Sequence, residues 1–359
     1  MNIASLYEIY KQYPSVQTDT RKLKDGDIFF ALKGPNFNGN KFAEQALANG
    51  AAYAVVDEAK YALNEQYLLV DDVLATLQKL ANYHRKQFSI PFIAITGSNG
   101  KTTTKELVTA VLSKRYKTYA TEGNLNNHIG VPLTLLKIKM DAEMAIIEMG
   151  ANHLYEIAGY CEVAMPTHGI ITNCEKAHIE GFGSEENIRK GKGELYDYIR
   201  NAGGTIFRNT DLPYLSEMAN GITKQITYGT KEATYTGQPK MNDVFLEVQL
   251  SDDIIKTNLV GDYNFPNAMV AIATGLHFNV PLADIKDALA TYTPDNSRSQ
   301  WLQKGSNKII LDAYNANPTS MRAAVLNFAQ ASLPNKMLWI GAMKEMGQTE
   351  QQDRDDLRR

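Results

Sequence analysis

The feature that most constrains this chain is the stretch PFIAITGSNGKTTT, residues 91–104. An apolar run over residues 91–95 predicts a short buried strand, which leads into a turn containing Gly97 and Gly100. Apolar residues at helical spacing follow Lys101 and Thr102. Strand, glycine-rich turn, Lys-Thr and helix in this order are typical of a phosphate-binding loop.

Each part of this loop has a chemical reason. Glycines allow backbone conformations that a side chain forbids, so the N–H groups of the loop can point inward to an anion at a helix N-terminus. Lys101 can reach terminal phosphates and the Thr102 hydroxyl can bind Mg²⁺. The stricter form of the pattern has a glycine where this chain has Ile95. An ordinary strand–turn–helix corner with a solvent-exposed lysine is the alternative.

Bulk composition narrows the class of protein. A chain of 359 residues suits two or three domains. A net charge of −3 gives no electrostatic footprint for nucleic acid, and the two cysteines, Cys161 and Cys174, lack ligand-like spacing. The N-terminus does not resemble a signal peptide and no apolar run could span a bilayer. We therefore expect a soluble cytoplasmic protein.

The order of predicted elements indicates an α/β architecture in three segments. Residues 1–85 mix short strands (27–32, 53–57 and 67–70) with helices (41–48 and 73–87). Residues 86–295 repeat a strand–helix alternation with strands at 91–96, 145–148 and 169–172, and contain a more β-like insert at 223–260. Such alternation predicts a mostly parallel sheet covered by helices on both faces, with ligands at the carboxyl ends of its strands. Residues 296–359 add strands at 308–311 and 337–340 and a charged, helix-like tail, EQQDRDDLRR.

Two further residues lie where strands of this sheet should end. Glu148 closes an apolar run, and a carboxylate beside a phosphate loop suits Mg²⁺; a solvent-facing strand end is the alternative. His178 follows the next predicted strand, and from the residues alone a loop histidine with an ordinary hydrogen bond is the simpler interpretation.

Lys192 occupies an unusual position in a predicted helix. Ser184 can cap this helix, and Lys192 shares the helical spacing of its apolar face with Ile188 and Leu195, whereas Lys190 points away. A buried lysine favours its neutral amine, which CO₂ could convert to a carbamate able to bind Mg²⁺. A lysine whose stem covers apolar surface is the simpler alternative.

Three polar segments could line a ligand. Asn124, Asn126 and Asn127 could bond a peptide or sugar, or form a capped turn. Thr20 and Arg21, next to Asp19, could pair with a diphosphate or form a plain surface turn. The run DAYNANPTSM, residues 312–321, suits a ligand-lining loop between a strand and a helix.

Together these residues resemble the Mur ligases of peptidoglycan synthesis over nearly the whole chain. Within that family the sequence is most similar to the MurF type, which joins D-Ala-D-Ala to UDP-N-acetylmuramoyl-tripeptide. The resemblance is carried by the following motifs: TDTRKLKDGDIFFALKG, TGSNGKTTT, GNLNNHIGVPLTLL, IIEMG, AHIEGFGS, KGELY, GDYNFPNA, DNSR, DAYNANPTSM and GAMKEMG.

The resemblance implies a role for each position. Lys101, Glu148, His178 and Lys192 are the expected catalytic residues. ATP is expected to contact Gly97, Ser98, Asn99, Gly100, Lys101, Thr102, Thr103, Asn267, Arg298, Asp312 and Tyr314. The UDP-linked substrate is expected at Thr20, Arg21, Asn126 and Asn127. Two Mg²⁺ ions are expected at Thr102, Glu148, His178 and a carbamylated Lys192.

The resemblance also implies a domain plan and a chemistry. Residues 1–85 would bind the UDP moiety, 86–295 would bind ATP, and 296–359 would begin a Rossmann-like third domain that usually continues further. Asn38 and Asn40 stand where the family usually has Asp and His. ATP would phosphorylate the tripeptide carboxylate, and D-Ala-D-Ala would displace the phosphate, in a monomer with no nucleic-acid partner or membrane span. A sister ligase for folate or the third stem residue, a kinase, and a non-catalytic nucleotide-binding fragment are the competing interpretations.

Overall fold

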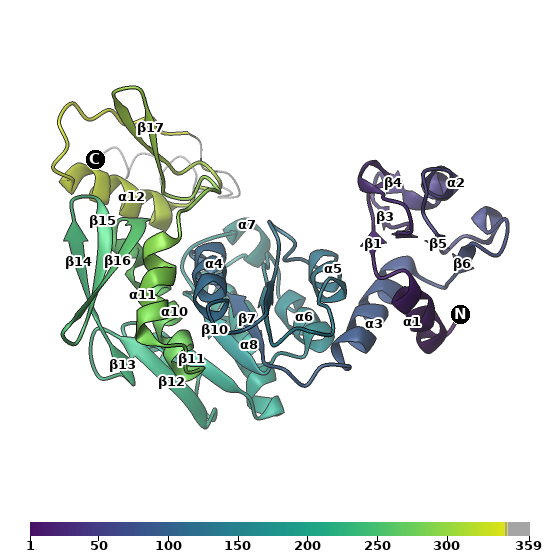
Figure 1. Ribbon diagram of the computed structural model, residues 1–359, viewed down its shortest axis with the longest axis horizontal. Coiled ribbons are helices and arrows are strands. Elements are labelled where there is room, and N and C mark those ends of the chain that lie inside the picture. Colours follow the sequence, from purple (N-terminus) through teal and green to yellow (C-terminus); the bar gives the residue numbers. More distant parts are fainter. Residues whose placement is uncertain (342, 344–359) are drawn as a thin grey trace.

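The computed structural model describes residues 1–341 and 343. Figure 1 shows three groups of elements along the longest axis: the first 70 residues at one end, a large central sheet with its helices, and the last described elements at the other end. The predicted α/β class is confirmed by the parallel sheets described below.

The N-terminal group is built on a four-stranded parallel sheet with the order β1-β2-β5-β6. The predicted strands at 27–32, 53–57 and 67–70 are confirmed as β2, β5 and β6, each a little shorter than predicted. The strands are β1 (Val16–Gln17), β2 (Ile28–Phe30), β5 (Tyr53–Val56) and β6 (Tyr67–Leu69), and a small hairpin joins β3 (Lys33–Gly34) and β4 (Phe37–Asn38). The helices are α1 (Ile3–Gln12), α2 (Ala43–Ala48) and α3 (Val73–Arg85), with 3₁₀ turns at Thr20–Lys22, Gly39–Phe42 and Ala59–Tyr61.

The central sheet has seven parallel strands in the order β13-β12-β11-β10-β7-β9-β8. Strand β7, which lies between β10 and β9, is buried along its whole length, because a parallel strand covered on both faces is apolar throughout. The strands are β7 (Phe92–Thr96), β8 (Thr118–Ala120), β9 (Met144–Glu148), β10 (His168–Ile171), β11 (Thr205–Asn209), β12 (Lys224–Gly229) and β13 (Tyr235–Thr236).

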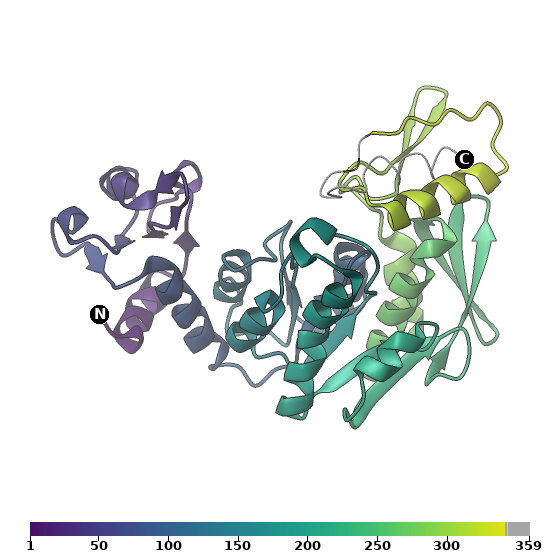
Figure 2. The same ribbon diagram turned by 180° about the vertical axis from the view of Figure 1, so that it is seen from behind.

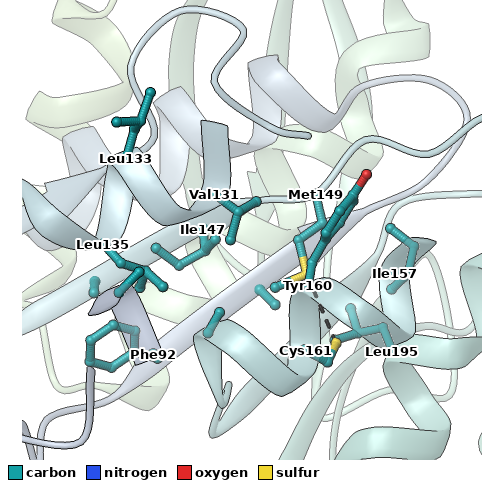
Figure 3. Packing of buried hydrophobic residues seen from close by; sticks show 14 of the residues in the cluster. Phe92, Val131, Leu133, Leu135, Ile147, Met149, Ile157, Tyr160, Cys161 and Leu195 are labelled. Atoms are coloured by element: carbon teal, nitrogen blue, oxygen red, sulfur yellow. Dashed lines mark hydrogen bonds between the residues drawn. The ribbon is translucent and has the colours of Figure 1, made fainter. Parts of the chain in front are cut away.

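Helices cover both faces of this sheet. Ile93 and Ile95 of β7 pack into one apolar cluster with α4, α10 and α11, and Phe92 and Ala94 pack into another with α5, α6 and α8. Figure 3 shows part of the second cluster, where Met149 and Cys161 meet beside Tyr160. The helices are α4 (Lys101–Leu112), α5 (Gly130–Leu136), α6 (Glu156–Ala164), α7 (Ile179–Phe182), α8 (Glu185–Ala202), α9 (Pro213–Met218), α10 (Phe265–His277) and α11 (Leu282–Thr291).

The same second cluster extends into the N-terminal helices. Leu6 of α1 and Leu77 and Leu80 of α3 belong to it. The Asn82 side chain also donates to the Glu162 carbonyl oxygen at 2.9 Å. Helices α1 and α3 therefore share an apolar core with the central sheet.

The insert predicted at 223–260 is only partly separate: its start, β12 and β13, joins the central parallel sheet, and its later part forms an antiparallel sheet beside α10. The last elements form a hairpin and a helix (Figure 2). The hairpin includes the strand predicted at 308–311. The elements are β14 (Gln238–Asn242), β15 (Phe245–Leu250), β16 (Asp253–Val260), the 3₁₀ turn Asp262–Asn264, β17 (Gln300–Lys304), β18 (Asn307–Leu311) and α12 (Pro318–Gln330).

The strand predicted at Met337–Ile340 is wrong. Among residues 1–341 and 343, these residues have no strand partner, and Met337 and Trp339 are 83% and 93% exposed. A strand needs a neighbour to satisfy its backbone groups, and β17 and β18 pair only with each other. The predicted tail at 350–359 and most of the GAMKEMG motif lie outside the described residues. In the part of the chain that the structure describes, no helix is long and apolar enough to cross a membrane.

Candidate active site

The glycine loop lies between β7 and α4, at the carboxyl edge of the central sheet (Figure 1). Gly97 has φ +144° and Gly100 has φ +81°. A Cβ atom on Gly97 would lie 2.0 Å from the Thr172 Oγ1, and one on Gly100 would lie 2.5 Å from the Asn267 Oδ1. Both glycines are therefore required by backbone conformation and by space, as a phosphate loop requires.

Residues that follow β10 hold the loop from one side. Ser98 donates its backbone N–H to the Asn173 carbonyl at 2.9 Å and its hydroxyl to the Glu175 carbonyl at 2.6 Å. The Thr172 hydroxyl donates to the Asn99 carbonyl at 2.6 Å, and the Asn99 amide donates to the Glu175 carboxylate at 2.9 Å. The loop is thus shaped before any ligand binds, which lowers the entropic cost of binding.

Lys101 begins α4 and folds back over the loop. Its Nζ donates to the Gly97 and Ser98 carbonyl oxygens at 2.7 and 3.1 Å. Burial lowers the pKa of Lys101 to about 8, an effect that Glu148 opposes and the charge of Arg298 reinforces. The solvent-exposed lysine of an ordinary corner is therefore not what the structure has, and a bound phosphate would restore a counter-charge to Nζ.

Glu148, at the end of β9, faces the start of α4. It is 1% exposed, so the alternative of a solvent-facing strand end is wrong. Its Oε1 accepts from the Thr102 hydroxyl at 3.1 Å and from the Asn126 amide at 2.8 Å, whereas its buried Oε2 has no hydrogen-bond partner among the described residues. A buried carboxylate oxygen left without a donor is costly, and a cation beside Thr102 would remove that cost.

The ligand atoms around Glu148 suit Mg²⁺ better than they suit a metal that is coordinated by protein side chains alone. Among residues 1–341 and 343, no three His, Cys, Asp or Glu side chains gather as a metal cluster. Mg²⁺ is commonly held by one or two carboxylates together with substrate phosphates and water. Glu148 and Thr102 beside an anion loop match this pattern.

Lys192 lies on α8, whose predicted cap is confirmed: the Ser184 side chain accepts from the Asn187 N–H. Lys192 is 1% exposed, so its head does not reach solvent and the alternative of a lysine that merely covers apolar surface is wrong. Its Nζ donates to the Ala151 carbonyl at 2.9 Å and lies 5.0 Å from the centre of the Phe182 ring.

Burial lowers the pKa of Lys192 to about 7, and the charge of Lys101 acts in the same direction. By contrast, Lys190 is exposed and pairs with Glu186 at 2.8 Å. A Cβ on Gly191 would lie 2.6 Å from the Phe182 ring, so close approach explains that glycine, whereas the neighbouring Gly193 has only an ordinary contact. The Lys192 amine is thus enclosed, and its lowered pKa makes the neutral form accessible near neutral pH.

His178 immediately precedes α7, with φ +54° in the left-handed region. It is half-buried, and α7 ends at Phe182, the ring that covers the Lys192 amine. The segment that begins at His178 therefore packs, through Phe182, against α8, the helix that carries Lys192.

The other residues predicted to contact the nucleotide lie on α4, on α10 and around the last hairpin. Asn267 of α10 accepts from the Thr104 hydroxyl at 3.1 Å and is the side chain nearest the Gly100 position. Thr103 lies in the first turn of α4. The guanidinium of Arg298 stacks on the Tyr314 ring at 3.8 Å.

Asp312 lies close to this Arg298–Tyr314 pair. It accepts from the Ser299 hydroxyl at 3.3 Å. Desolvation of its carboxyl group raises its pKa.

The predicted substrate residues divide into two groups. Asn126 contacts Glu148, as described, whereas the Asn127 side chain caps the start of α5 by accepting from the Ile129 and Gly130 N–H groups. Arg21 is exposed and pairs with Asp19 at 2.8 Å, and with Thr20 it lies in the N-terminal group, away from the glycine loop (Figure 1).

The two asparagines that depart from the family pattern are held in a polar cluster. Asn40 is 1% exposed and donates to the Asp57 carboxylate at 2.8 Å, while its own oxygen accepts from the Asp57 N–H at 3.0 Å. Asn38 donates to Glu58 at 2.8 Å. Both amides are satisfied where they stand.

Sequence reasoning missed several contacts that complete the site. The Asn317 amide donates to the Asn99 Oδ1 at 2.6 Å, and Glu106 accepts two bonds from Asn296. Asn317 belongs to the DAYNANPTSM run, but nothing in the local pattern pairs it with a residue 218 positions away.

The site geometry agrees with matches to known families. The Mur ligase middle domain matches residues 95–275, and a second model, Mur ligase family, catalytic domain, matches residues 12–85. The UDP-N-acetylmuramoyl-tripeptide–D-alanyl-D-alanine ligase of Bacillus subtilis is 37% identical over 94% of this chain and 75% of its own length. The Escherichia coli protein of the same name is 34% identical over 93% and 75%.

Solved structures agree. A crystal structure of MurF from Acinetobacter baumannii has a TM-score of 0.86 and 31% identity, and covers 96% of this chain and 77% of its own. MurF ligase from Thermotoga maritima in complex with ADP has a TM-score of 0.82 and 27% identity, and covers 96% and 81%. The chain belongs to the Mur ligase family.

Proposed function

We propose that this chain is an ATP-dependent ligase that joins D-Ala-D-Ala to UDP-N-acetylmuramoyl-tripeptide. The observation that carries the proposal is the group of half-buried Lys101 and buried Thr102 and Glu148 at a glycine loop, in a chain whose relatives bear that activity in their names. The reaction yields the UDP-linked pentapeptide, ADP and phosphate.

The loop and Lys101 bind the phosphates of ATP. The loop N–H groups and the Lys101 amine stabilise the charge that develops as the tripeptide carboxylate attacks the γ-phosphorus. Mg²⁺ would be held by Thr102 and Glu148 and would neutralise phosphate charge when bound. The amine of D-Ala-D-Ala then attacks the acyl carbon, loses a proton, and phosphate leaves. No side chain acts as a nucleophile, so positioning supplies much of the rate.

Lys192 is the second element of the proposal. The neutral form of its enclosed amine can add to CO₂, forming an N–C bond and releasing one proton, which leaves a carbamate anion. That anion, with His178, would hold a second Mg²⁺ near the acyl phosphate. The buried position of Lys192 and its low pKa of about 7 support this role.

The remaining residues are assigned to the part of the substrate or nucleotide that each would contact. Residues 1–85 would hold the UDP moiety through Thr20 and Arg21, residues 86–295 would bind ATP, and Asn126 and Asn127 would lie near the muramoyl group. From residue 296 onward, Arg298, Asp312 and Tyr314 would cover the nucleotide. A cytoplasmic monomer is the state that the family resemblance implies.

Phosphate release from ATP tests the proposal. With Mg²⁺, the proposal expects release that requires both UDP-tripeptide and D-Ala-D-Ala. Release without D-Ala-D-Ala that leaves a stable phosphorylated product would favour a kinase, and preference for a single amino acid would favour a sister ligase.

Chemical rescue tests Lys192. A Lys192→Ala variant is expected to lose at least 100-fold in turnover, because a buried anion that binds metal is removed. Short carboxylic acids should restore part of the rate by filling the space with a carboxylate. Lys190→Ala, on the exposed face of the same helix, is the matched control and should keep the wild-type rate. Absence of any rescue would count against the carbamate.

A further inference from the structure

The segment that carries Arg298 is strained. Ser297 and Ser299, on either side of it, have φ +58° and +48°, a left-handed conformation that costs a non-glycine residue roughly 1–3 kcal/mol. Such a conformation persists only where surrounding contacts hold it. The structure must therefore fix this segment from both sides.

The downstream side is fixed by residues of the third segment and of the turn before α10. The Ser299 hydroxyl lies 2.7 Å from the Tyr263 hydroxyl and 3.3 Å from the Asp312 carboxylate. The Ala313 N–H donates to the Ser297 carbonyl at 2.9 Å. The Ser299 contacts anchor the residue after Arg298, and the Ala313 bond anchors the residue before it.

The upstream side is fixed by Glu106. Its two carboxylate oxygens accept from the Asn296 amide at 3.0 and 2.9 Å, and the Tyr292 hydroxyl donates to one of them at 2.5 Å. Glu106 lies on α4 little more than one turn after Lys101. One carboxylate therefore ties the Arg298 segment to the helix that begins with Lys101.

We propose that Glu106 is a positioning residue for the nucleotide: through Asn296 it fixes Arg298 at a set distance from Lys101. This inference rests on the proposed function, which places both cations on ATP. The Arg298 Nε is buried and, in the described part of the chain, has no hydrogen-bond partner. A donor held in this way, with the guanidinium stacked on Tyr314, is arranged for an anion from outside the chain.

A Glu106→Gln variant tests the role. An amide keeps the shape, but it carries no charge and cannot accept on both of its terminal atoms, so at least one of the three bonds is lost. Equilibrium binding of ATP should weaken about tenfold, the size expected for a hydrogen bond to a charged group. Glu247→Gln is the matched control, because Glu247 also accepts from an asparagine, Asn242, at 2.9 Å but lies in the β14–β15 pair; its ATP affinity should not change.

The Arg298→Ala background separates positioning from general damage. If Glu106 acts through Arg298, adding Glu106→Gln to Arg298→Ala should weaken ATP binding less than twofold further. A tenfold further loss in that background, or unchanged affinity in the single variant, would overturn the inference. Wild-type protein that fails to bind ATP would instead overturn the proposed function.

A milder variant guards against misfolding. Tyr292→Phe removes one hydroxyl from the same carboxylate and leaves the Asn296 bonds in place. It should weaken ATP binding two- to fivefold in the wild-type background and not at all in the Arg298→Ala background. An equal loss of ATP affinity in both backgrounds would contradict the proposal that Glu106 acts by positioning Arg298.

Discussion

At the scale of single residues, the site combines groups that are unfavourable without ligands. Among the described residues, one Glu148 carboxylate oxygen has no donor, and burial lowers the pKa values of the Lys101 and Lys192 amines to about 8 and about 7. Native proteins place such groups at sites where a ligand or metal completes them. The residues that make the apo protein less stable are thus those expected to bind ATP and Mg²⁺.

Glu148→Gln tests this relation. The variant removes a buried charge, so in the presence of a chelator its melting temperature should equal or exceed that of the wild type. Its phosphate release should fall at least 100-fold, because the proposed metal ligand is lost. Glu143→Gln, on the exposed segment before the same strand, should match the wild type in both assays. A Glu148→Gln variant within twofold of wild-type turnover would contradict the metal role.

Residue chemistry was the part of the site that the sequence predicted best. The loop, Glu148 and the buried face of α8 are local patterns, and each lies where the pattern placed it. Glu106 and Asn317 were not predicted, because their partners lie 190 and 218 positions away and hydrophobic periodicity carries no information on such pairs. The roles assigned to individual residues stay predictions.

At the scale of elements, strand prediction succeeded where burial on both faces leaves a continuous apolar run. The predicted strands at 91–96, 145–148 and 169–172 are β7, β9 and β10, each with paired neighbours. The run at 337–340 has a similar composition but no neighbouring strand in the described chain. Composition indicates which segments can be strands, whereas pairing decides which segments become strands.

Helix α12 allows a test at this scale, because Asn317 serves two functions with different atoms. Its Oδ1 caps the helix by accepting from the Ser320 N–H at 2.9 Å, and its amide donates to Asn99 in the glycine loop. Asn317→Asp keeps the cap and loses the donor, whereas Asn317→Ala loses both.

The two variants should therefore differ in the hydrogen-exchange rates of α12 but have similar affinities for ATP. Amides in the first turn of α12 should exchange faster in Asn317→Ala only, since loss of a cap costs about 1 kcal/mol. Both variants should bind ATP several-fold more weakly than the wild type. Wild-type affinity in Asn317→Asp would show that the bond to Asn99 has no part in nucleotide binding.

At the scale of the whole molecule, the chain places its proposed substrate and nucleotide regions in different groups of elements. Thr20 and Arg21 lie in a 3₁₀ turn of the N-terminal group, whereas Arg298 and Tyr314 flank the β17–β18 hairpin, which lies at the other end of the molecule (Figures 1 and 2). The shared core under α1 and α3 joins the N-terminal group to the central sheet. An extended substrate such as a UDP-linked peptide suits this arrangement.

His84 makes this junction sensitive to acid. Its ring lies 3.0 Å from the Tyr7 hydroxyl of α1 and 2.8 Å from the Ile138 carbonyl, and burial lowers its pKa, partly offset by the Ile138 bond. A lowered folded pKa means that the unfolded chain binds more protons below about pH 6.5. Stability is therefore full above that pH and is lost as the pH falls toward the folded pKa.

A His84→Gln variant should lack this contribution. Between pH 7 and pH 5, the free energy of unfolding of the wild type should fall more than that of the variant, as measured by urea denaturation. An equal fall in both proteins would show that His84 does not titrate with folding.

The measurement that tests the central claim most directly follows oxygen from the tripeptide carboxylate. The UDP-tripeptide is labelled with ¹⁸O in its terminal carboxylate and incubated with ATP, Mg²⁺ and D-Ala-D-Ala. If the carboxylate attacks the γ-phosphorus and the amine then displaces phosphate, each pentapeptide formed should be accompanied by one phosphate carrying one ¹⁸O. Phosphate without label, or release of phosphate without pentapeptide, would contradict the ligase chemistry proposed for this chain.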